Sequence, residues 1–422
     1  MDPEAYLDSL EPIGWKLGLE RMRTLSTLLG LPQHRFASIH VVGTNGKSSV
    51  TRMIAALLEA HGVPAGACVS PHTTRWSERV LVHGREIAAA EFAAAVERTA
   101  VAAQTVNETL EEGEAVTQFE LATAAAFVAL ANARVEAAAV EAGLGGRLDA
   151  TNTIPSKVTV LTSVGLDHTE WLGETEEEIA TEKLAVLRDQ TTLVLGRVRP
   201  PVAALARRVA EERGAGLIVA PEDPGAEIAL HVRGPFQRRN FALARTAAEA
   251  FLGELDPGRV AGVAAAIEIP GRLERVASDP PTFLDAAHNP DGARALAEAL
   301  PEVAAGRPVI AVLAILADKD ADAMVAALAP AVKHAICTQL PAPDEPETPR
   351  SKASQSRRRS LGAAELSRIC GQAGVEAEAE ADFGTAMARG RELARQAGGV
   401  LLVAGSHYAL GPARAALGLD AG

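Results

Sequence analysis

The sequence predicts a two-domain α/β protein, in which a larger N-terminal domain with a mainly parallel sheet precedes a smaller, Rossmann-like α/β domain. At 422 residues the chain is too long for one ordinary hydrophobic core. Short apolar runs alternate with helical stretches along both halves, an order that is typical of parallel sheets. Pro270 and Gly271 interrupt this alternation, because the pair breaks both helices and strands. We therefore expect domains at residues 1–270 and 271–422.

Composition and charge restrict the class of protein. Apolar residues make up 48% of the chain and charged residues 23%, as in a soluble globular protein. The formal net charge of −13 argues against a nucleic-acid partner, which requires a basic surface. It does not argue against small anionic substrates, because Lys, Arg and Mg²⁺ can set the local field inside a cleft.

Three features predict a cytoplasmic protein. Cys68, Cys337 and Cys370 are widely spaced and odd in number, which indicates neither a zinc site nor a disulfide framework. The N-terminus is acidic and lacks the basic and then apolar order of a signal peptide. No apolar run approaches the roughly 20 residues needed to cross a bilayer, so we expect no membrane association.

A glycine-rich stretch follows the first predicted strand, Ile39–Val42, and precedes a predicted helix. In such a loop, glycines let backbone N–H groups close on phosphate oxygens, and the helix N-terminus adds partial positive charge. A lysine then reaches the outer phosphates of a nucleotide and a Ser hydroxyl holds Mg²⁺. The stretch consists of Gly43, Thr44, Asn45, Gly46, Lys47, Ser48 and Ser49.

This stretch lacks the first glycine of the general phosphate-loop pattern, because Val41 occupies that position. A plain strand-to-helix turn is the alternative interpretation. Five apolar residues after the loop have helical spacing, and Gly62 follows them as a helix cap. The order of strand, glycine loop and helix favours a nucleotide-triphosphate site, and therefore a P-loop ATPase domain. The five apolar residues are Val50, Met53, Ile54, Leu57 and Leu58.

Five further strands are predicted in this domain, at residues 66–69, 137–140, 158–163, 192–195 and 217–219. The first three of them each end in a polar loop. In open parallel sheets, ligands bind outside the carboxyl ends of the strands. We therefore expect four side chains to lie at one edge of the sheet. They are Lys47, Ser70, Glu141 and His168.

Two pairs of residues in predicted helices have both a structural and a functional interpretation. The helical region 88–134 is interrupted near 111–114, and Thr117 and Glu120 form a capping-box pattern at the start of its second half. Glu182 and Lys183, in the predicted helix 176–187, form either a solvated ion pair or part of a catalytic site. The sequence leaves both choices open.

The C-terminal half repeats the alternation of strands and helices. Polar loops follow three of its predicted strands, and the segment 341–360, rich in Pro, Ser and charge, is typical of a surface loop without an assigned partner. The predicted strands are 282–284, 309–316, 335–339 and 400–404, and the polar loops are 285–292, 318–320 and 405–408.

Many of these motifs occur in the same order in a known family. From about Leu17 to Tyr408 the chain resembles the folylpolyglutamate synthase/dihydrofolate synthase family, which belongs with the Mur ligases. The glycine loop and the turn 288–290 are its most specific features. The matching motifs span 43–49, 70–72, 141–152, 165–168, 182–183, 270–272, 285–290, 318–320 and 405–406.

The resemblance implies where nucleotide and metal bind. The glycine loop, from Gly43 to Ser49, would hold the ATP phosphates. Oxygen ligands with one imidazole suit Mg²⁺ when phosphate and water complete the octahedron. The implied residues for adenine, phosphate and ribose are Asn240, Arg272 and Asp285, and the implied Mg²⁺ ligands are Ser49, Ser70, Glu141 and His168.

One residue of the loop departs from the family pattern. The family usually has Gly between the loop lysine and the serine, where this chain has Ser48. Both Ser48 and Ser49 therefore offer a hydroxyl to the metal, and alignment with the family favours Ser49.

The resemblance also implies catalytic and substrate-binding residues. Lys183 matches a lysine that is carbamylated in this superfamily, and the resulting anion helps to order a second metal ion. Leu17, Gly18 and Leu19 match a segment that contacts pteroate in some members. The implied catalytic residues are Lys47, Asp149, His168 and Lys183, and the further substrate residues are Arg147, His288 and Ser406, of which the last two would face glutamate.

The implied reaction is ATP-dependent amide formation. ATP would convert the carboxylate of a dihydropteroate or a reduced folate into an acyl phosphate, which the amine of L-glutamate then attacks. Catalysis would rest on positioning and on charge neutralisation by Mg²⁺ and Lys47, and closure of two hinged domains would exclude water. The sequence leaves open which acceptor is used, and the resemblance implies a monomer.

Three other functions fit parts of the sequence. A cell-wall precursor ligase of the same superfamily usually carries a further domain before the phosphate loop, whereas 42 residues precede Gly43 here. A non-catalytic ATP-binding protein would not need Glu141, His168 and Lys183 together. A small-molecule kinase would not explain the second α/β domain.

Overall fold

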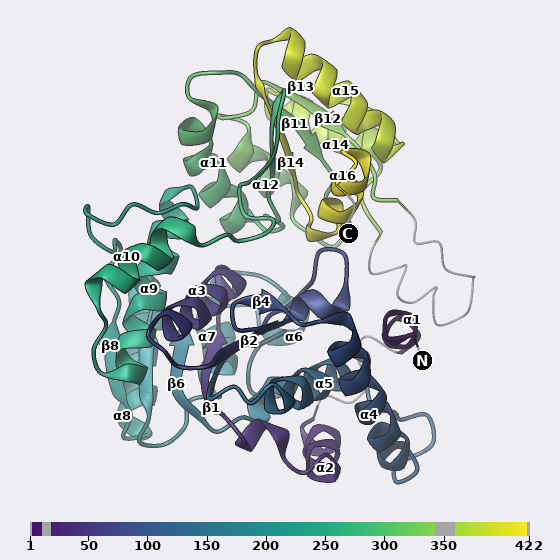
Figure 1. The fold of residues 1–422 in the computed structure, drawn as a ribbon. Coiled ribbons are helices and arrows are strands. Elements are labelled where there is room, and N and C mark those ends of the chain that lie inside the picture. The colour runs from purple at the N-terminus through teal and green to yellow at the C-terminus, as the bar shows by residue number, and fades with distance from the viewer. Residues whose placement is uncertain (1, 11–17, 342–358, 420–422) are drawn as a thin grey trace. The chain divides into compact units, whose positions relative to one another are not determined.

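The structure is a computed structural model that describes residues 2–10, 18–341 and 359–419. Leu17 and most of the predicted surface loop 341–360 lie outside these residues. The chain forms two compact units, of which the first comprises Met1–His231 and Arg238–Ile267 and the second Val232–Gln237 and Glu268–Gly422. Each unit is a sheet flanked by helices, so the predicted α/β class is confirmed (Figure 1).

The first unit contains an eight-stranded sheet in the order β4-β3-β2-β5-β1-β6-β7-β8. Its strands pair in parallel except β3 and β4, which form an antiparallel edge beside β2. The sequence did not predict β3 and β4, because strands this short carry too little alternation. The strands are β1 (Ala37–Val42), β2 (Ala65–Cys68), β3 (Val80–Val82), β4 (Arg85–Glu86), β5 (Ala137–Glu141), β6 (Ser156–Leu161), β7 (Thr192–Leu195) and β8 (Gly216–Val219).

Helices cover this sheet with small and aliphatic side chains. The helix α5 is buried on nearly all sides, and its alanines let it pack closely against its neighbours. A second apolar cluster joins α7 and α8 to β6 and β7. The helices are α1 (Pro3–Asp8), α2 (Glu20–Leu28), α3 (Lys47–Ala60), α4 (Ala89–Asn107), α5 (Gln118–Asn132), α6 (Thr169–Leu172), α7 (Glu176–Leu184), α8 (Pro200–Glu212), α9 (Pro235–Leu252) and α10 (Pro257–Ala266).

The second unit contains a six-stranded sheet in the order β13-β12-β11-β14-β10-β9, in which only β9 is antiparallel to its neighbour. Alternate residues of β11 point to opposite faces: Ala311 packs with α11, α12 and α14, whereas Val312 packs with α15 and α16. The strands are β9 (Glu274–Ser278), β10 (Pro281–Leu284), β11 (Val309–Leu313), β12 (His334–Cys337), β13 (Glu376–Ala379) and β14 (Val400–Ala404). The helices are α11 (Pro290–Ala304), α12 (Ala321–Leu328), α14 (Ala363–Gln372), α15 (Phe383–Gln396) and α16 (Leu410–Ala416).

Within the described residues, no helix is both long enough and apolar enough to cross a membrane.

Candidate active site

The carboxyl ends of β2, β5, β1 and β6 lie side by side in the first sheet, in that order. They lead to Ser70, Glu141, the glycine loop and the segment 162–168. This confirms that the four polar strand ends predicted from the sequence share one edge of the sheet. β1 lies between strands that come later in the chain, which is where ligands bind in open α/β sheets.

The two glycines of the loop are required by its backbone and its neighbours. Gly43 has a φ of +150°, and a Cβ there would lie 1.9 Å from Thr162 Oγ1. Gly46 has a φ of +84°, and a Cβ there would lie 2.7 Å from Asn240 Oδ1. The loop therefore runs tightly against β6 and α9 and ends at the N-terminus of α3.

Hydroxyl groups after β6 hold this loop in place. Thr162 Oγ1 donates to the carbonyl of Asn45 at 2.7 Å, and Asn45 N donates to Ser163 Oγ at 3.0 Å. Thr44 Oγ1 lies 3.2 Å from the carbonyl of Gly165, to which it donates. Sequence reasoning missed Thr162 and Ser163 as site residues, although two adjacent hydroxyl residues at the carboxyl end of the predicted strand 158–163 were a usable signal.

Two lysines contact the backbone of the glycine loop. Lys47 Nζ donates to the carbonyl of Thr44 at 3.2 Å, and Lys183 Nζ donates to the carbonyl of Gly43 at 3.0 Å. Lys183 is only 4% exposed. Its burial, together with the charge of Lys47, lowers the pKa of Lys183 to about 7. Lys183 is therefore not part of a solvated ion pair.

Glu182 instead forms an ion pair with Arg147. Their side chains approach to 2.9 Å, and Arg147 is 60% exposed. The pairing connects α7 to the loop after β5, because Arg147 N also donates to the carbonyl of Glu182 at 3.0 Å. Lys183 takes no part in this ion pair, and its side chain is directed toward the glycine loop.

A buried carboxylate joins three of the strand ends. Glu141 is 2% exposed, and its Oε1 accepts a hydrogen bond of 2.9 Å from Ser48 Oγ while its Oε2 accepts one of 2.9 Å from Ser70 N. Ser48 Oγ also lies 3.3 Å from the carbonyl of Ser70. Ser49 is 1% exposed, and its hydroxyl has no hydrogen-bond partner among the described residues. The hydroxyl that contacts Glu141 is thus that of Ser48.

His168 follows β6 at the same edge. It has a left-handed backbone conformation, with a φ of +52°, directly before α6, and its Nε2 lies 3.8 Å from Asp167 Oδ1. In the parts of the chain that the structure describes, no group of three or more His, Cys, Asp and Glu side chains is arranged to hold a metal ion. The predicted Mg²⁺ ligands do not form such a group, because only Glu141 and His168 are of these residue types and the other ligands are serine hydroxyls. The carboxylate and hydroxyl oxygens among them are ligands of the type that Mg²⁺ accepts.

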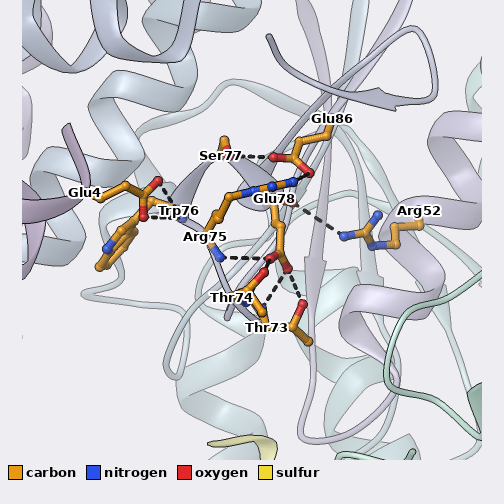
Figure 2. Close-up of polar contacts among 9 residues, drawn as sticks. All are labelled: Glu4, Arg52, Thr73, Thr74, Arg75, Trp76, Ser77, Glu78 and Glu86. Atoms are coloured by element: carbon orange, nitrogen blue, oxygen red, sulfur yellow. Dashed lines mark hydrogen bonds and ion pairs between the residues drawn. The ribbon is translucent and has the colours of Figure 1, made fainter. Parts of the chain in front are cut away.

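The segment after Ser70 is folded around the carboxylate of Glu78 (Figure 2). This carboxylate accepts hydrogen bonds from the backbone N–H and the hydroxyl of Thr73 and of Thr74, and from Arg75 N. Burial alone would raise the pKa of Glu78, but these hydrogen bonds outweigh it and lower the pKa to about 2. The charge of Glu78 therefore fixes the turn that follows Ser70, a role the sequence did not predict.

The N-terminal helix supports the same segment. Trp76 N donates to the carboxylate of Glu4 (Figure 2). Trp76 Nε1 donates to Asp8 Oδ1 at 2.9 Å. The helix α1 therefore holds the segment 73–79 through Trp76, and Arg52 of α3 contacts the carbonyl of Glu78 in the same segment.

Asp149 is buried in the loop between β5 and β6. Its Oδ2 accepts a hydrogen bond of 2.8 Å from Leu144 N, and its Oδ1 accepts one of 3.0 Å from Thr151 N. Burial raises the pKa of Asp149. Both carboxylate oxygens are thus occupied within their own loop.

The predicted pteroate-contacting segment is described only in part. Gly18 precedes α2, and Leu19 is the buried residue before its first turn. In the next turn, Arg21 Nε lies 3.1 Å from both carboxylate oxygens of Glu120. Glu120 also closes the capping box with Thr117, so the structural interpretation of this pair is confirmed.

Polar groups also gather at the carboxyl ends of β10 and β14 in the second unit, and these strands are neighbours. After β10, Asp285 is buried and accepts hydrogen bonds from Leu273 N at 2.9 Å and Ala287 N at 2.8 Å. Burial raises the pKa of Asp285, and the positive charge of Arg272 opposes this effect.

The two predicted glutamate-binding residues follow the same strand ends. His288 Nδ1 lies 2.9 Å from the carbonyl of Ala286, so this nitrogen carries the proton and donates it. After β14, Ser406 is buried, and its Oγ accepts a hydrogen bond of 3.2 Å from Tyr408 N.

Comparison with known proteins identifies the family to which both units belong. The family model of the Mur ligase middle domain matches residues 41–223, and that of the Mur ligase glutamate ligase domain matches residues 271–407. A dihydrofolate synthase/folylpolyglutamate synthase of Mycobacterium tuberculosis is 36% identical over 365 residues, which cover 77% of this chain and 74% of the relative.

Solved structures show the same similarity over almost the whole chain. The Mycobacterium tuberculosis folylpolyglutamate synthase complexed with ADP has a TM-score of 0.88 and 32% identity, covering 99% of this chain and 98% of that one. The bifunctional folylpolyglutamate synthase/dihydrofolate synthase of Yersinia pestis, complexed with AMPPNP and a Mn ion, has a TM-score of 0.80 and 30% identity, covering 98% and 97%. The chain therefore belongs to the Mur ligase family, in the group of folylpolyglutamate and dihydrofolate synthases, and is an ATP-dependent, amide-forming ligase.

Proposed function

We propose that the protein joins L-glutamate to the carboxylate of a dihydropteroate or a reduced folate, with ATP and Mg²⁺. The observation that carries this proposal is the contact of Glu141 with Ser48 and Ser70 beside the glycine loop. A metal-binding carboxylate next to a phosphate loop is what transfer of a phosphoryl group requires.

The chemistry follows from the poor reactivity of a free carboxylate. Phosphoryl transfer from ATP to a carboxylate oxygen of the acceptor gives an acyl phosphate and ADP. The amine of L-glutamate then attacks the acyl carbon, and inorganic phosphate leaves with the former carboxylate oxygen. Lys47 would neutralise charge on the phosphates throughout, while Mg²⁺ would supply a further positive charge at the phosphate oxygens.

We assign the metal hydroxyl to Ser48 rather than to Ser49. Ser48 Oγ contacts both Glu141 and the carbonyl of Ser70, which are the neighbours that a ligand of the same ion would have. Ser49 belongs to the buried face of α3. In this proposal Ser48, Ser70, Glu141 and His168 supply the protein ligands, and Asp149 positions the loop between β5 and β6 without contacting the reacting atoms.

Lys183 is proposed to react with carbon dioxide. A carbamate would exchange the buried ammonium for an anion, which suits a position beside a divalent metal and ATP. The low pKa of Lys183 supports this proposal, because only the neutral amine adds to carbon dioxide.

Each unit contributes further proposed binding residues. In the first, Asn240 is proposed to bind nucleotide because it lies against Gly46, and Gly18, Leu19 and Arg147 are proposed to bind the acceptor. In the second, Arg272 and Asp285 are proposed to bind nucleotide, and His288 and Ser406 are proposed to bind glutamate.

A paired assay tests the function. We expect purified protein to consume ATP only when Mg²⁺, L-glutamate and an acceptor are all present. Parallel reactions with dihydropteroate and with tetrahydrofolate, read by mass spectrometry, will show on which acceptor the added glutamate appears. ATP consumption that needs neither glutamate nor acceptor would contradict the ligase assignment.

A further inference from the structure

A buried histidine lies in β1, three residues before the glycine loop. His40 is fully buried, and its Nε2 lies 2.8 Å from Thr151 Oγ1. Thr151 Oγ1 in turn donates a hydrogen bond to Asp149 Oδ1. The three side chains thus form a continuous chain of hydrogen bonds from β1 to the loop that follows Glu141.

The direction of these hydrogen bonds can be derived from proton counting. The hydroxyl of Thr151 has one hydrogen, which it donates to the carboxylate of Asp149. Its oxygen must therefore accept the hydrogen bond from His40, so His40 Nε2 carries a proton. Burial, with the nearby charge of Arg188, lowers the pKa of His40 to about 3. His40 is therefore a neutral imidazole that is protonated at Nε2.

Asp149 connects this chain of hydrogen bonds to the backbone of the loop between Glu141 and Thr151. Its second oxygen, Oδ2, accepts the hydrogen bond from Leu144 N, three residues after Glu141. Further along, Gly146 packs against α7, and a Cβ there would lie 2.9 Å from the carbonyl of Lys183. The loop fixed by Asp149 therefore lies between the proposed metal ligand and the proposed carbamate.

We propose that His40 is a positioning residue of the ligase reaction, which acts through Thr151 and Asp149 to hold the loop that connects Glu141 with Lys183. The inference rests on the proposed roles of Glu141 and Lys183. None of the sequence motifs identified His40 as a site residue. It lies within β1, where a buried neutral histidine would otherwise be interpreted as part of the core.

Two substitutions separate this role from ordinary packing. Thr151→Val keeps the shape of the side chain and removes the hydroxyl, whereas Thr151→Ser keeps the hydroxyl. A matched control is Thr159→Val: Thr159 is buried, pairs directly with His40 across β1 and β6, and its hydroxyl has no partner among the described residues. Both valine variants thus remove one buried hydroxyl next to His40, but only one breaks the chain to Asp149.

Three measurements on the full chain test the proposal. Nitrogen-15 NMR of histidine-labelled protein should show His40 neutral and protonated at Nε2. Hydrogen exchange should accelerate over residues 142–149 in Thr151→Val but not in Thr151→Ser or Thr159→Val. In Thr151→Val, kcat and the affinity for Mn²⁺ in the presence of ADP should fall by about tenfold, as is typical when a group behind a metal ligand is lost, with KM for ATP nearly unchanged.

Each outcome decides the proposal. Equal behaviour of Thr151→Val and Thr159→Val, or a His40 protonated at Nδ1, would overturn it. If the wild type formed no amide with any acceptor, the proposed function would fail, whereas hydrogen exchange and the nitrogen signature would still decide whether His40 holds the loop. Should Thr151→Val not fold, His40→Gln, which retains an N–H donor, and His40→Met allow the same comparison.

Discussion

The unusual pKa of Lys183 leads to a quantitative prediction about its modification. At about pH 7.5, a lysine with the ordinary pKa of 10.5 is neutral in about one molecule in a thousand, whereas a pKa of about 7 makes about three in four neutral. Carbon dioxide adds only to the neutral amine, giving a carbamate and a proton. Burial of Lys183 therefore raises the reactive fraction by a factor of several hundred.

The sign of the pH dependence follows from the same numbers. Because the pKa is lowered, the reactive form is present above about pH 7 and is lost as the pH falls through that value. Between about pH 6 and pH 8 the neutral fraction should rise from about a tenth to about nine tenths. Ligase activity that depends on the carbamate should follow this rise when bicarbonate is supplied.

Carbon-13 NMR with labelled bicarbonate measures the modification directly. We expect one carbamate resonance in the wild type, its loss in Lys183→Ala, and its retention in Lys157→Ala, which removes an exposed lysine. Activity of Lys183→Ala should fall by about 10- to 100-fold, as for residues behind a metal, and return in part with a short-chain carboxylic acid. An unmodified Lys183 in fully active protein would refute the reasoning.

Three further predictions concern the same edge of the sheet. Lys47→Ala should abolish ATP turnover with little change in melting temperature; unfolding of the variant, or near-normal activity, would contradict the phosphate-loop role. Ser48→Ala should weaken Mn²⁺ binding in the presence of ADP by about tenfold, as measured by electron paramagnetic resonance, and Ser49→Ala should change it by less than about twofold. The reverse order would restore Ser49 as the ligand. Glu78→Gln should lower the free energy of unfolding by about 2 kcal/mol in urea denaturation, because hydrogen bonds to a charged acceptor are lost. No change would show that the turn after Ser70 holds without this charge.

All parallel strands of both sheets except β13 were predicted from the sequence, because each of them is a short apolar run between helices. The helical interruption near 111–114 and the capping box of Thr117 and Glu120 were also predicted, since both are local sequence patterns. The strands β9 and β13 were missed, and β13 in particular consists of alternating Glu and Ala with little burial. Edge strands of this kind are defined by pairing with a neighbour rather than by their own composition.

The contacts that hold the site together were beyond sequence reasoning for a different reason. Thr162 and Asn45 are 117 positions apart, and Lys183 and Gly43 are 140 apart. No local pattern links such residues. The strand-end rule predicts only that they share an edge of the sheet, and the hydrogen bonds between them depend on how each loop folds.

Helix periodicity could nevertheless have indicated that Ser49 and Lys183 are buried. Ser49 is four residues before Met53 and therefore lies on the apolar stripe of α3, whereas Ser48 aligns with Arg52 beside that stripe. Lys183 likewise falls three and four residues after Ala180 and Ile179, on the buried face of α7. A polar residue at an apolar helical position is expected to be buried. The side chain of Lys183 is directed at the backbone of the glycine loop, and its burial lowers its pKa. The lowered pKa is the property that its proposed reaction with carbon dioxide needs.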